Sequence, residues 1–542
     1  MKSLSKFIAV LFILGAALVG CDGEYDSLVD ANADRNPIPD MEIEASQGDA
    51  DFSNYIAIGN SITAGFMDAA LYNNGQEFSL GAQLSKQFEL TGAPSTFNQP
   101  DINSENGFNT LANSGDGSGP ILGRFKLDTS IPGPSPVING DPIGPYTGSA
   151  SALNNFGVPG LQVGQLLTPD TGNPSSPAFN PFYARFASSP GTSTILDDAI
   201  STDPTFFTLW IGNNDVLGYA TSGATRPEIL TSQANFQAQF SATINRLMTE
   251  TTANGVVANI PPILATPVFQ AIPYNVIELD QASADQLNAS FSTLNAVFDG
   301  MANDTFLFSD FTQEDADQRK VSYQAGNNPI LIVDPNLDDL SDEFDLLVTF
   351  GQITTEQREA LEPYVQSRPM VVNPQTGPEL VLISAGAILG TPAVPDDPNT
   401  PIGVAIPLGA RYTLTAANIV EIETARGTFN AIIEGTVTAA GSRLAFYDTN
   451  ELGGAFSDIF GLDGSEIGIT VDGVFLNPDF SPNGVFSTDG IHPNARGTAI
   501  LANEFLEAIE SEFNATIPKI DVLALPSVSL CAGSCVSQQG GS

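Results

Sequence analysis

The most informative stretch of the chain spans residues 55–65 and reads Tyr55-Ile56-Ala57-Ile58-Gly59-Asn60-Ser61-Ile62-Thr63-Ala64-Gly65. Its first four residues are mostly apolar, which predicts a buried parallel strand, and Gly59 then predicts a tight turn into a helix. This pattern places Ser61 at the carboxyl end of a strand and beside a helix N-terminus, where open α/β sheets build their sites. The serine is either a nucleophile or a helix cap, and this stretch alone leaves both interpretations open.

The chain has one histidine, His492, which lies in the string Ser487-Thr488-Asp489-Gly490-Ile491-His492-Pro493-Asn494. Histidine is the only side chain whose unperturbed pKa lies near neutral pH, so base-assisted chemistry at that pH points to this residue. A single histidine by default lies at the surface or packs as a polar residue without a catalytic role. Asp489, three residues upstream, can instead orient one ring nitrogen while the other takes a proton from a hydroxyl. Ser61 is the best candidate for that hydroxyl.

Two further strings can supply hydrogen-bond donors to a developing anion. The first, Ala152-Leu153-Asn154-Asn155-Phe156-Gly157-Val158-Pro159-Gly160, is a short run that closes on glycines and can expose a backbone N–H beside a ligand. The second, Phe206-Phe207-Thr208-Leu209-Trp210-Ile211-Gly212-Asn213-Asn214-Asp215, predicts a buried strand that ends in a glycine and two amides. Each string has a simpler interpretation, a turn in the first case and an Asx-type helix start in the second.

These strings, in this order, resemble the four sequence blocks of the SGNH (GDSL-type) serine hydrolases. The blocks correspond here to Gly59-Asn60-Ser61-Ile62, Asn155-Phe156-Gly157, Gly212-Asn213-Asn214-Asp215 and Asp489-Gly490-Ile491-His492. The first block departs from the family's commonest wording, with Asn60 for Asp and Ile62 for Leu. Neither position belongs to the catalytic relay, so the departure weakens the string match more than the mechanism.

The resemblance implies a role for each residue of the site. Ser61 is the nucleophile, His492 is the general base and Asp489 orients it, while the Ser61 and Gly157 amides and the Asn214 side chain form the oxyanion hole. It also implies a three-layer α/β/α flavodoxin-like core with a mainly parallel sheet, and no metal or organic cofactor. The substrate would be a carboxylic ester, either lipid-like or an acetylated glycan. Two alternatives stay open: a thioesterase or lysophospholipase with the same residues, and a non-catalytic cell-envelope binding lipoprotein on this scaffold.

The hydrolase domain is expected to span residues 51–518, with further strands at 255–260 and 443–449 and a closing helix at 494–513. Two insertions, at about 74–150 and 270–412, would enlarge it. The first is dense in Gly, Pro, Ser and Asn and predicts long irregular loops. In the second we expect a helix opened by a capping box at residues 354–357, a strand within 379–390, and a return to the core through a helix capped by Thr415. We expect the insertions to shape the mouth of the site and to decide the substrate.

The N-terminus predicts export and a lipid anchor. Residues 1–20 combine a basic start with an apolar stretch of signal-peptide length, and Leu18-Val19-Gly20-Cys21 resembles a bacterial lipobox. That resemblance implies cleavage before Cys21 and acylation of this cysteine, so that the protein is tethered to a membrane of the cell envelope without spanning it. An ordinary secretory signal is the alternative. Residues 21–50 would form an acidic tether.

The other two cysteines, Cys531 and Cys535, lie in a C-terminal tail at residues 519–542, which we expect outside the core. In an exported protein the pair predicts a small disulfide loop. Metal binding by two thiols with no histidine nearby is the less favoured interpretation.

Composition limits the partners. Eighteen basic and 62 acidic residues give a formal net charge of −44, which disfavours binding to nucleic acid or to anionic membrane surfaces. The acidic residues are scattered along the chain, which predicts a solvated acidic surface suited to salty surroundings. We expect a monomer that meets a small-molecule or glycan ester and contacts the membrane only through its lipid.

Overall fold

Five apolar runs form one parallel sheet at the centre of the computed structural model, which describes residues 44–113, 119–128, 133–531 and 535. The chain divides into two units, residues 1–45 and residues 46–542, and the second contains the sheet. The predicted lipidation site Cys21 lies outside the described residues. The strands are β1 (Tyr55–Gly59), β4 (Asn155–Gly157), β5 (Phe206–Trp210), β6 (Asn254–Ala258) and β15 (Leu444–Tyr447). Their order is β15-β6-β5-β1-β4, and each neighbouring pair is parallel, which confirms the predicted fold class.

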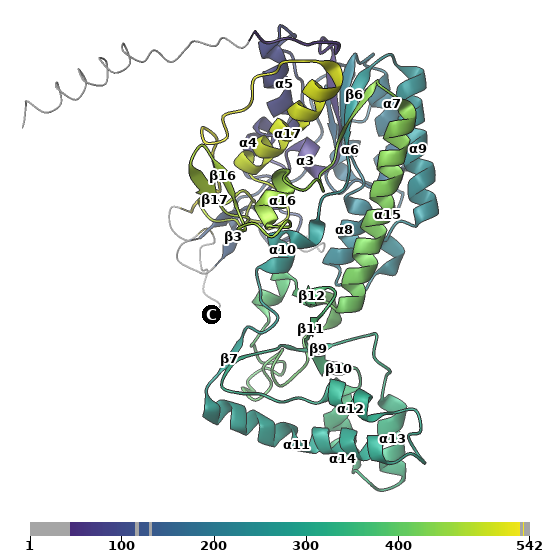
Figure 1. Cartoon of the computed structure of the whole chain (residues 1–542), viewed down its shortest axis with the longest axis vertical. Helices are drawn as coiled ribbons and strands as arrows, with labels where there is room; N and C mark the ends of the chain where they lie inside the picture. The colour runs from purple at the N-terminus through teal and green to yellow at the C-terminus, as the bar shows by residue number, and fades with distance from the viewer. Residues whose placement is uncertain (1–43, 114–118, 129–132, 532–534, 536–542) are drawn as a thin grey trace, which may run out of the picture. The chain divides into compact units, whose positions relative to one another are not determined.

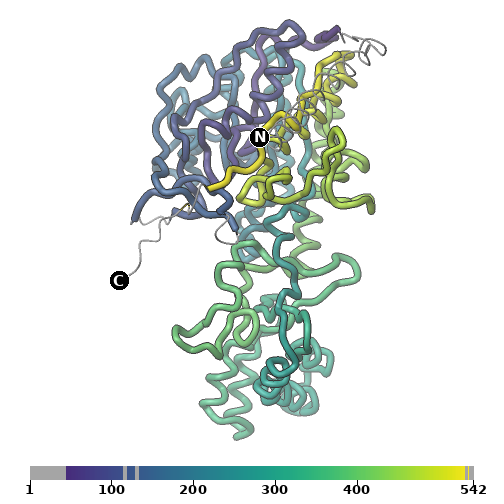
Figure 2. Tube along the Cα trace, turned by 90° about the vertical axis from the view of Figure 1, so that its left-hand side faces the viewer, coloured from purple at the N-terminus to yellow at the C-terminus, as the bar shows by residue number. Residues whose placement is uncertain are grey.

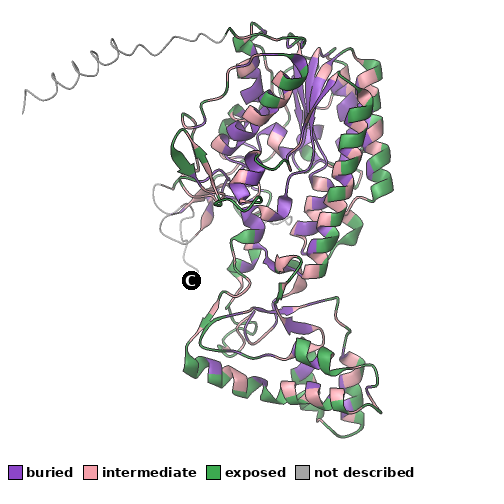
Figure 3. Ribbon diagram, in the orientation of Figure 1, coloured by how far each residue is buried: buried purple, intermediate pink, exposed green. Residues whose placement is uncertain are grey.

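Helices cover both faces of this sheet, as Figure 1 shows, because alternate strand residues point to opposite sides. Ile56 and Ile58 of β1 pack in one apolar cluster with residues of the helices on the first face, and Tyr55 and Ala57 pack in a second cluster on the other. Figure 3 shows the strands as the buried layer between them. The first face carries α7 (Ile195–Ile200), α8 (Asn214–Thr221), α9 (Gln233–Glu250) and α15 (Ala416–Ala440), and the second carries α5 (Leu80–Leu90), α16 (Ala455–Phe460) and α17 (Ala495–Phe513).

Helix α5 corrects the prediction that residues 74–150 form only irregular loops. It follows α4 (Asn73–Glu77) and starts where Ser79 accepts a hydrogen bond from the N–H of Ala82. Its Leu84 and Phe88 are buried against the sheet, so this helix belongs to the core. The many glycines and prolines of residues 74–150 predicted loops, and a helix of only three turns was too short to change that prediction. The later part of the region is mostly irregular, with the antiparallel hairpin β2 (Leu122–Leu127) and β3 (Pro134–Ile138).

Most of the second insertion packs in apolar clusters of its own, while Leu380 and Leu382 join the cluster on the first face of the sheet. Figure 2 shows the chain leaving the core as a teal segment and returning in green. Thr354 and Gln357 form the predicted capping box. The expected strand at 379–390 is only two residues long and gives way to a 3-10 helix, because Leu380 and Val381 alone find a partner strand. The elements are α10 (Pro267–Gln270), β7 (Ile277–Leu279), α11 (Gln281–Asn303), α12 (Gln313–Arg319), β8 (Gly326–Asn328), β9 (Leu331–Val333), α13 (Ser341–Thr349), α14 (Thr355–Leu361), β10 (Ser367–Pro369), β11 (Val372–Asn373), β12 (Gly377–Pro378), β13 (Leu380–Val381) and β14 (Thr413–Leu414).

A buried ion cluster lies where this insertion rejoins the core. Arg368 donates to Asp334 Oδ2 at 2.7 Å and to both oxygens of Glu379, at 2.6 and 2.8 Å. Glu379 also accepts a hydrogen bond at 3.0 Å from the N–H of Ala416, the first residue of α15. Thr415 caps that helix as predicted. The cluster therefore ties the insertion to the long helix that follows it.

The two ends of this unit pack on the core further than the sequence predicted. Ser46 pairs with Thr516, so residues before the predicted boundary at 51 also pack on this unit. The tail after residue 518 was expected outside the core, but Val522 is buried in the second apolar cluster and Leu530 pairs with Leu127 of β2. The tail packs on the core because it carries apolar side chains that can be buried there, although its composition is typical of a loop. Between α16 and α17 the chain forms a short hairpin of β16 (Ile469–Val471) and β17 (Val474–Leu476).

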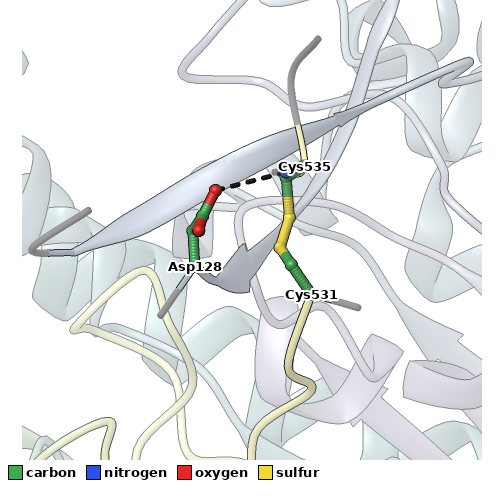
Figure 4. Close-up of side chains that lie close together, drawn as sticks. All are labelled: Asp128, Cys531 and Cys535. Atoms are coloured by element: carbon green, nitrogen blue, oxygen red, sulfur yellow. Dashed lines mark hydrogen bonds between the residues drawn. A yellow bond between two sulfur atoms is a disulfide. The ribbon is translucent and has the colours of Figure 1, made fainter. Parts of the chain in front are cut away.

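Cys531 and Cys535 form a disulfide beside β2, and the N–H of Cys535 donates to Asp128 at 3.2 Å (Figure 4). Asp128 and the two sulfurs are close enough for a metal site, since their ligand atoms lie within 4.8 Å of one another. The disulfide removes both thiolates that such a site would need. The two cysteines therefore form a covalent cross-link within the tail.

Candidate active site

Ser61 lies immediately after β1, as the first residue of the short helix α3 (Ser61–Ala64). Gly59 makes this turn possible, since a Cβ atom there would lie 2.5 Å from the carbonyl oxygen of Trp210 in the neighbouring strand. Asn60 caps the helix, because its side-chain oxygen accepts from the N–H of Ile62 at 3.2 Å. The amide of Ser61 belongs to the first turn, where backbone N–H groups have no partner within the helix. Strand, turn and cap together fix the serine at the carboxyl edge of the sheet.

His492 brings the end of the chain to this serine. Its Nε2 lies 2.8 Å from Ser61 Oγ, and its Nδ1 lies 2.8 Å from Asp489 Oδ2. The loop that carries both residues turns sharply at Gly490, where φ is +72°, and the N–H of Ser487 donates to the carbonyl of His492 at 2.7 Å. The structure thus brings together the three residues singled out as nucleophile, base and orienting acid.

Asp489 is buried and fully supplied with hydrogen-bond donors. Its Oδ1 accepts from the N–H groups of Ile491 and His492, both at 2.9 Å, and its Oδ2 accepts from the N–H of Ala69 at 3.0 Å and from the imidazole. Burial by itself would raise the pKa of Asp489, but the charge of His492 and these hydrogen bonds lower the pKa to about 2. The carboxylate therefore stays ionised and holds one ring tautomer in place.

A second buried carboxylate, Asp68, supports this loop, and sequence patterns did not identify it. Its Oδ1 accepts from the N–H and the hydroxyl of Thr488, at 3.0 and 2.6 Å, and its Oδ2 accepts from Tyr72 at 2.7 Å. Asp68 and Ala69 both have left-handed backbone, at φ 56° and 60°, which is how Ala69 presents its N–H to Asp489. Burial raises the pKa of Asp68 despite these bonds. No spacing relates this residue to the catalytic blocks, so only the fold reveals it.

The oxyanion hole requires a correction. Gly157 was expected to donate its amide, but that N–H is already bonded to Asn155 Oδ1 at 2.8 Å, and a Cβ atom there would collide with the backbone of Thr63 and Ala64. Gly160 instead lines the open space beside Ser61, with left-handed backbone at φ 75° and no atom within 4 Å of a Cβ position. The glycine-closing run of the sequence contained both residues. Only the packing distinguishes them.

Asn214, at the start of α8, lines the same space. One hydrogen of its side-chain amide donates to the carbonyl of Leu161 at 3.0 Å, which fixes the side chain. The group has a second hydrogen to give. Ser61, Gly160 and Asn214, which follow three different strands, therefore line one open space.

Two pockets meet at Ser61, His492 and Asn214. The first is a narrow apolar slot with a cavity volume of about 50 Å³, and the second is a wider, more open groove of about 290 Å³. No residue of 270–412 lines either pocket, which corrects the expectation that the second insertion shapes the mouth; Thr110 and Leu111 of the first insertion do line the groove. The slot is lined by Ile263, Phe456, Ile459, Val485, Phe486 and Leu501, and the groove by Phe66, Thr110, Leu111, Phe182 and Thr221.

The fold is a three-layer α/β/α core, and the site at its carboxyl edge has the residues of a hydrolase. The family model of the GDSL-like lipases and acylhydrolases matches residues 55–505, which is most of the chain. The chain belongs to this family and is a hydrolase that acts on ester bonds. No curated protein and no solved structure matched it.

Proposed function

We propose that this protein cleaves carboxylic esters by a serine mechanism with an acyl-enzyme on Ser61. The observation that carries the proposal is the continuous pair of 2.8 Å contacts from Ser61 Oγ to His492 Nε2 and from His492 Nδ1 to Asp489 Oδ2. A serine hydroxyl is a weak nucleophile until a neighbouring base accepts its proton. His492 is the chain's sole histidine and stands at hydrogen-bond distance from it.

The reaction runs in two halves. Ser61 Oγ attacks the ester carbonyl while His492 takes its proton, and the oxyanion is held by the amides of Ser61 and Gly160 and by the Asn214 side chain. The tetrahedral species then expels the alcohol, whose oxygen receives the proton from His492. Water then gives a proton to the same imidazole and attacks the acyl carbon. The second tetrahedral species breaks its bond to Ser61 Oγ, which receives the proton from His492, and the acid is released. Asp489 stays ionised throughout and stabilises the imidazolium.

The test is hydrolysis of p-nitrophenyl acetate and butanoate by the full-length protein, beside Ser61→Ala and His492→Ala. We expect turnover to fall by a factor of about 10⁴ to 10⁶ in both variants, with unchanged folding by circular dichroism. A fluorophosphonate probe should label the parent and not Ser61→Ala. Turnover that survives both substitutions would place the activity elsewhere. A folded parent with neither turnover nor labelling would favour the non-catalytic binding lipoprotein.

A thioesterase or lysophospholipase would use the same residues, so the substrate panel includes an acyl thioester and a lysophospholipid. Their kcat/KM values, compared with those of the oxygen esters, rank these alternatives directly.

We also propose that Cys21 carries a lipid that anchors the protein in the cell envelope, on the support of the lipobox-like string before it. Among the helices that the structure describes, none is long and apolar enough to cross a membrane. A Cys21→Ala protein should move from the membrane fraction to the soluble fraction of cells that process lipoproteins. Retention in the membrane fraction would refute the lipid anchor.

A further inference from the structure

The slot and the groove differ in closure as well as in width. The side chains deep in the slot are buried, including Phe456, Ile459 and Leu501 at 6%, 3% and 3% exposure. In the groove Leu111 is 66% exposed, and Thr221 is half-buried. One side of Ser61 is therefore the more enclosed and more apolar recess, and the other side is more open to solvent.

From this asymmetry we infer which arm of the ester occupies each pocket: the more enclosed slot holds an unbranched acyl chain, and the more open groove holds the alcohol. This inference rests on the proposed acyl-enzyme and deepens it, since it selects a lipid-like acyl ester over an acetylated glycan.

The order of events in the reaction supports the assignment. Once the acyl group is bonded to Ser61, the alcohol must depart and a water molecule must reach the same carbonyl carbon while the acyl arm stays in place. An alcohol held in the more enclosed slot would have the more restricted way out past the acyl-enzyme. An alcohol held in the groove leaves directly to solvent, and water can enter beside His492 by the same path.

The chemistry of the slot supports an unbranched hydrocarbon. Its polar lining groups are largely used by the protein itself, since Asn60 Oδ1 accepts from the N–H of Ile62 and the Thr266 hydroxyl donates to the carbonyl of Ile263 at 2.7 Å. Asn213 Oδ1 has no hydrogen-bond partner but is itself buried away from the free space. Sugar hydroxyls would lose their water there without replacement bonds. An acetyl group would leave the slot unfilled, whereas a longer chain would bury its methylenes.

Helix α16, which lies beside α17 in the second layer (Figure 1), supplies two of the residues that line the slot. Phe456 and Ile459 lie on it one turn apart, and Phe456 is packed on Phe460 with ring centroids 6.1 Å apart. A larger side chain at Ile459 should fill part of the slot's free space and leave less room for an acyl chain.

The experiment measures kcat/KM for p-nitrophenyl acetate, butanoate, hexanoate and 2,2-dimethylpropanoate with the full-length protein. Burial of each added methylene should raise kcat/KM about fourfold, hence about 15-fold from acetate to butanoate. The branched ester should be poorer than butanoate by at least about tenfold, since overfilling a packed site is costly. Ile459→Phe should lower the hexanoate-to-acetate ratio about tenfold or more. Thr221→Phe, the matched enlargement in the groove, should leave that ratio near the parent value. A ratio lowered by Thr221→Phe and not by Ile459→Phe would reverse the assignment.

A second measurement does not depend on variants that fold. The parent protein is treated with p-nitrophenyl hexylphosphonate, and the structure of the Ser61 adduct is determined. A hexyl chain in the slot supports the inference, and a hexyl chain in the groove overturns it. Absence of both turnover and a Ser61 adduct would overturn the proposed serine mechanism and the acyl assignment together. That outcome is distinct from an adduct whose chain lies in the groove.

Discussion

Substitution of Asp215 by asparagine should make the protein more stable at high pH and leave its stability near pH 4 unchanged. Asp215 is 0% exposed at the start of α8, where it accepts hydrogen bonds from the N–H of Val163 at 3.0 Å and from the hydroxyl of Thr231 at 2.7 Å. Burial raises the pKa of Asp215 from 3.8 to about 6, although these hydrogen bonds act in the opposite direction. An asparagine has the same shape, and its amide can donate to the Thr231 oxygen while its carbonyl accepts from Val163.

The sign and size of the effect follow from the folded and unfolded pKa values of this carboxyl. A group whose pKa is raised by folding binds its proton more tightly in the folded state, so its stability contribution is complete below pH 4 and is lost as pH rises through about 6. Each pKa unit corresponds to about 1.36 kcal/mol, so the rise from 3.8 to about 6 corresponds to about 3 kcal/mol. Asp215→Asn should avoid that loss and exceed the parent by up to about 3 kcal/mol at pH 8.

The assay is urea unfolding at several pH values between 4 and 8, followed by the fluorescence of the sole tryptophan, Trp210, which is buried in β5. The quantity compared is the difference in unfolding free energy between parent and variant, in which the titrations common to both proteins cancel. Thr231→Val, which removes a bond that lowers the pKa of Asp215, should steepen the pH dependence. If Asp215→Asn were less stable than the parent by a margin that grows toward pH 8, the reasoning would be refuted. The donors would then stabilise the Asp215 carboxylate by more than burial destabilises it.

Three further outcomes are expected. Asn214→Ala should lower kcat about 100- to 1000-fold with little change in KM, because it removes an oxyanion donor. A loss of kcat/KM that came entirely from a higher KM would exclude that role. Asp68→Ala should lower kcat about 10- to 100-fold by releasing Thr488, whereas the isosteric Asp68→Asn should keep most of the parent kcat. The pH–rate profiles of parent and variants, measured in parallel, separate a loss of positioning from unfolding. Arg368→Met should destabilise the fold by about 3–5 kcal/mol, since it leaves Glu379 and its neighbouring carboxylate buried without their cation; denaturant unfolding measures the loss, and a change below about 1 kcal/mol would contradict it.

The sheet and most of the catalytic set were predictable because they depend on local patterns. Apolar runs ending in glycine predicted β1 and β5, and parallel strands bring their carboxyl ends to one edge, where Ser61 and Asn214 were expected. The single histidine with its upstream acid required no knowledge of the fold. The prediction placed Ser61 and His492 together across 431 residues, and the structure has them in contact.

Other features depended on which hydrogen bonds and which spaces remain after folding. Both Gly157 and Gly160 stand in one glycine-rich run, and only the bond from Asn155 shows that the first amide is already used. The helix α5 was hidden by the composition around it, and its place in the core became visible only through its packing on the sheet.

The sequence by itself determined the fold class and the family, and it singled out Ser61 and His492 as the candidate nucleophile and base, because burial periodicity and residue chemistry are properties of short segments. The tertiary structure decided which glycine can donate, which second carboxylate supports the Asp489 loop, and which residues enclose the slot. Asp68 and Thr488 are 420 residues apart, and the slot walls come from several separate segments. Donor availability and cavity shape are sums over contacts between distant segments, and no local pattern contains them.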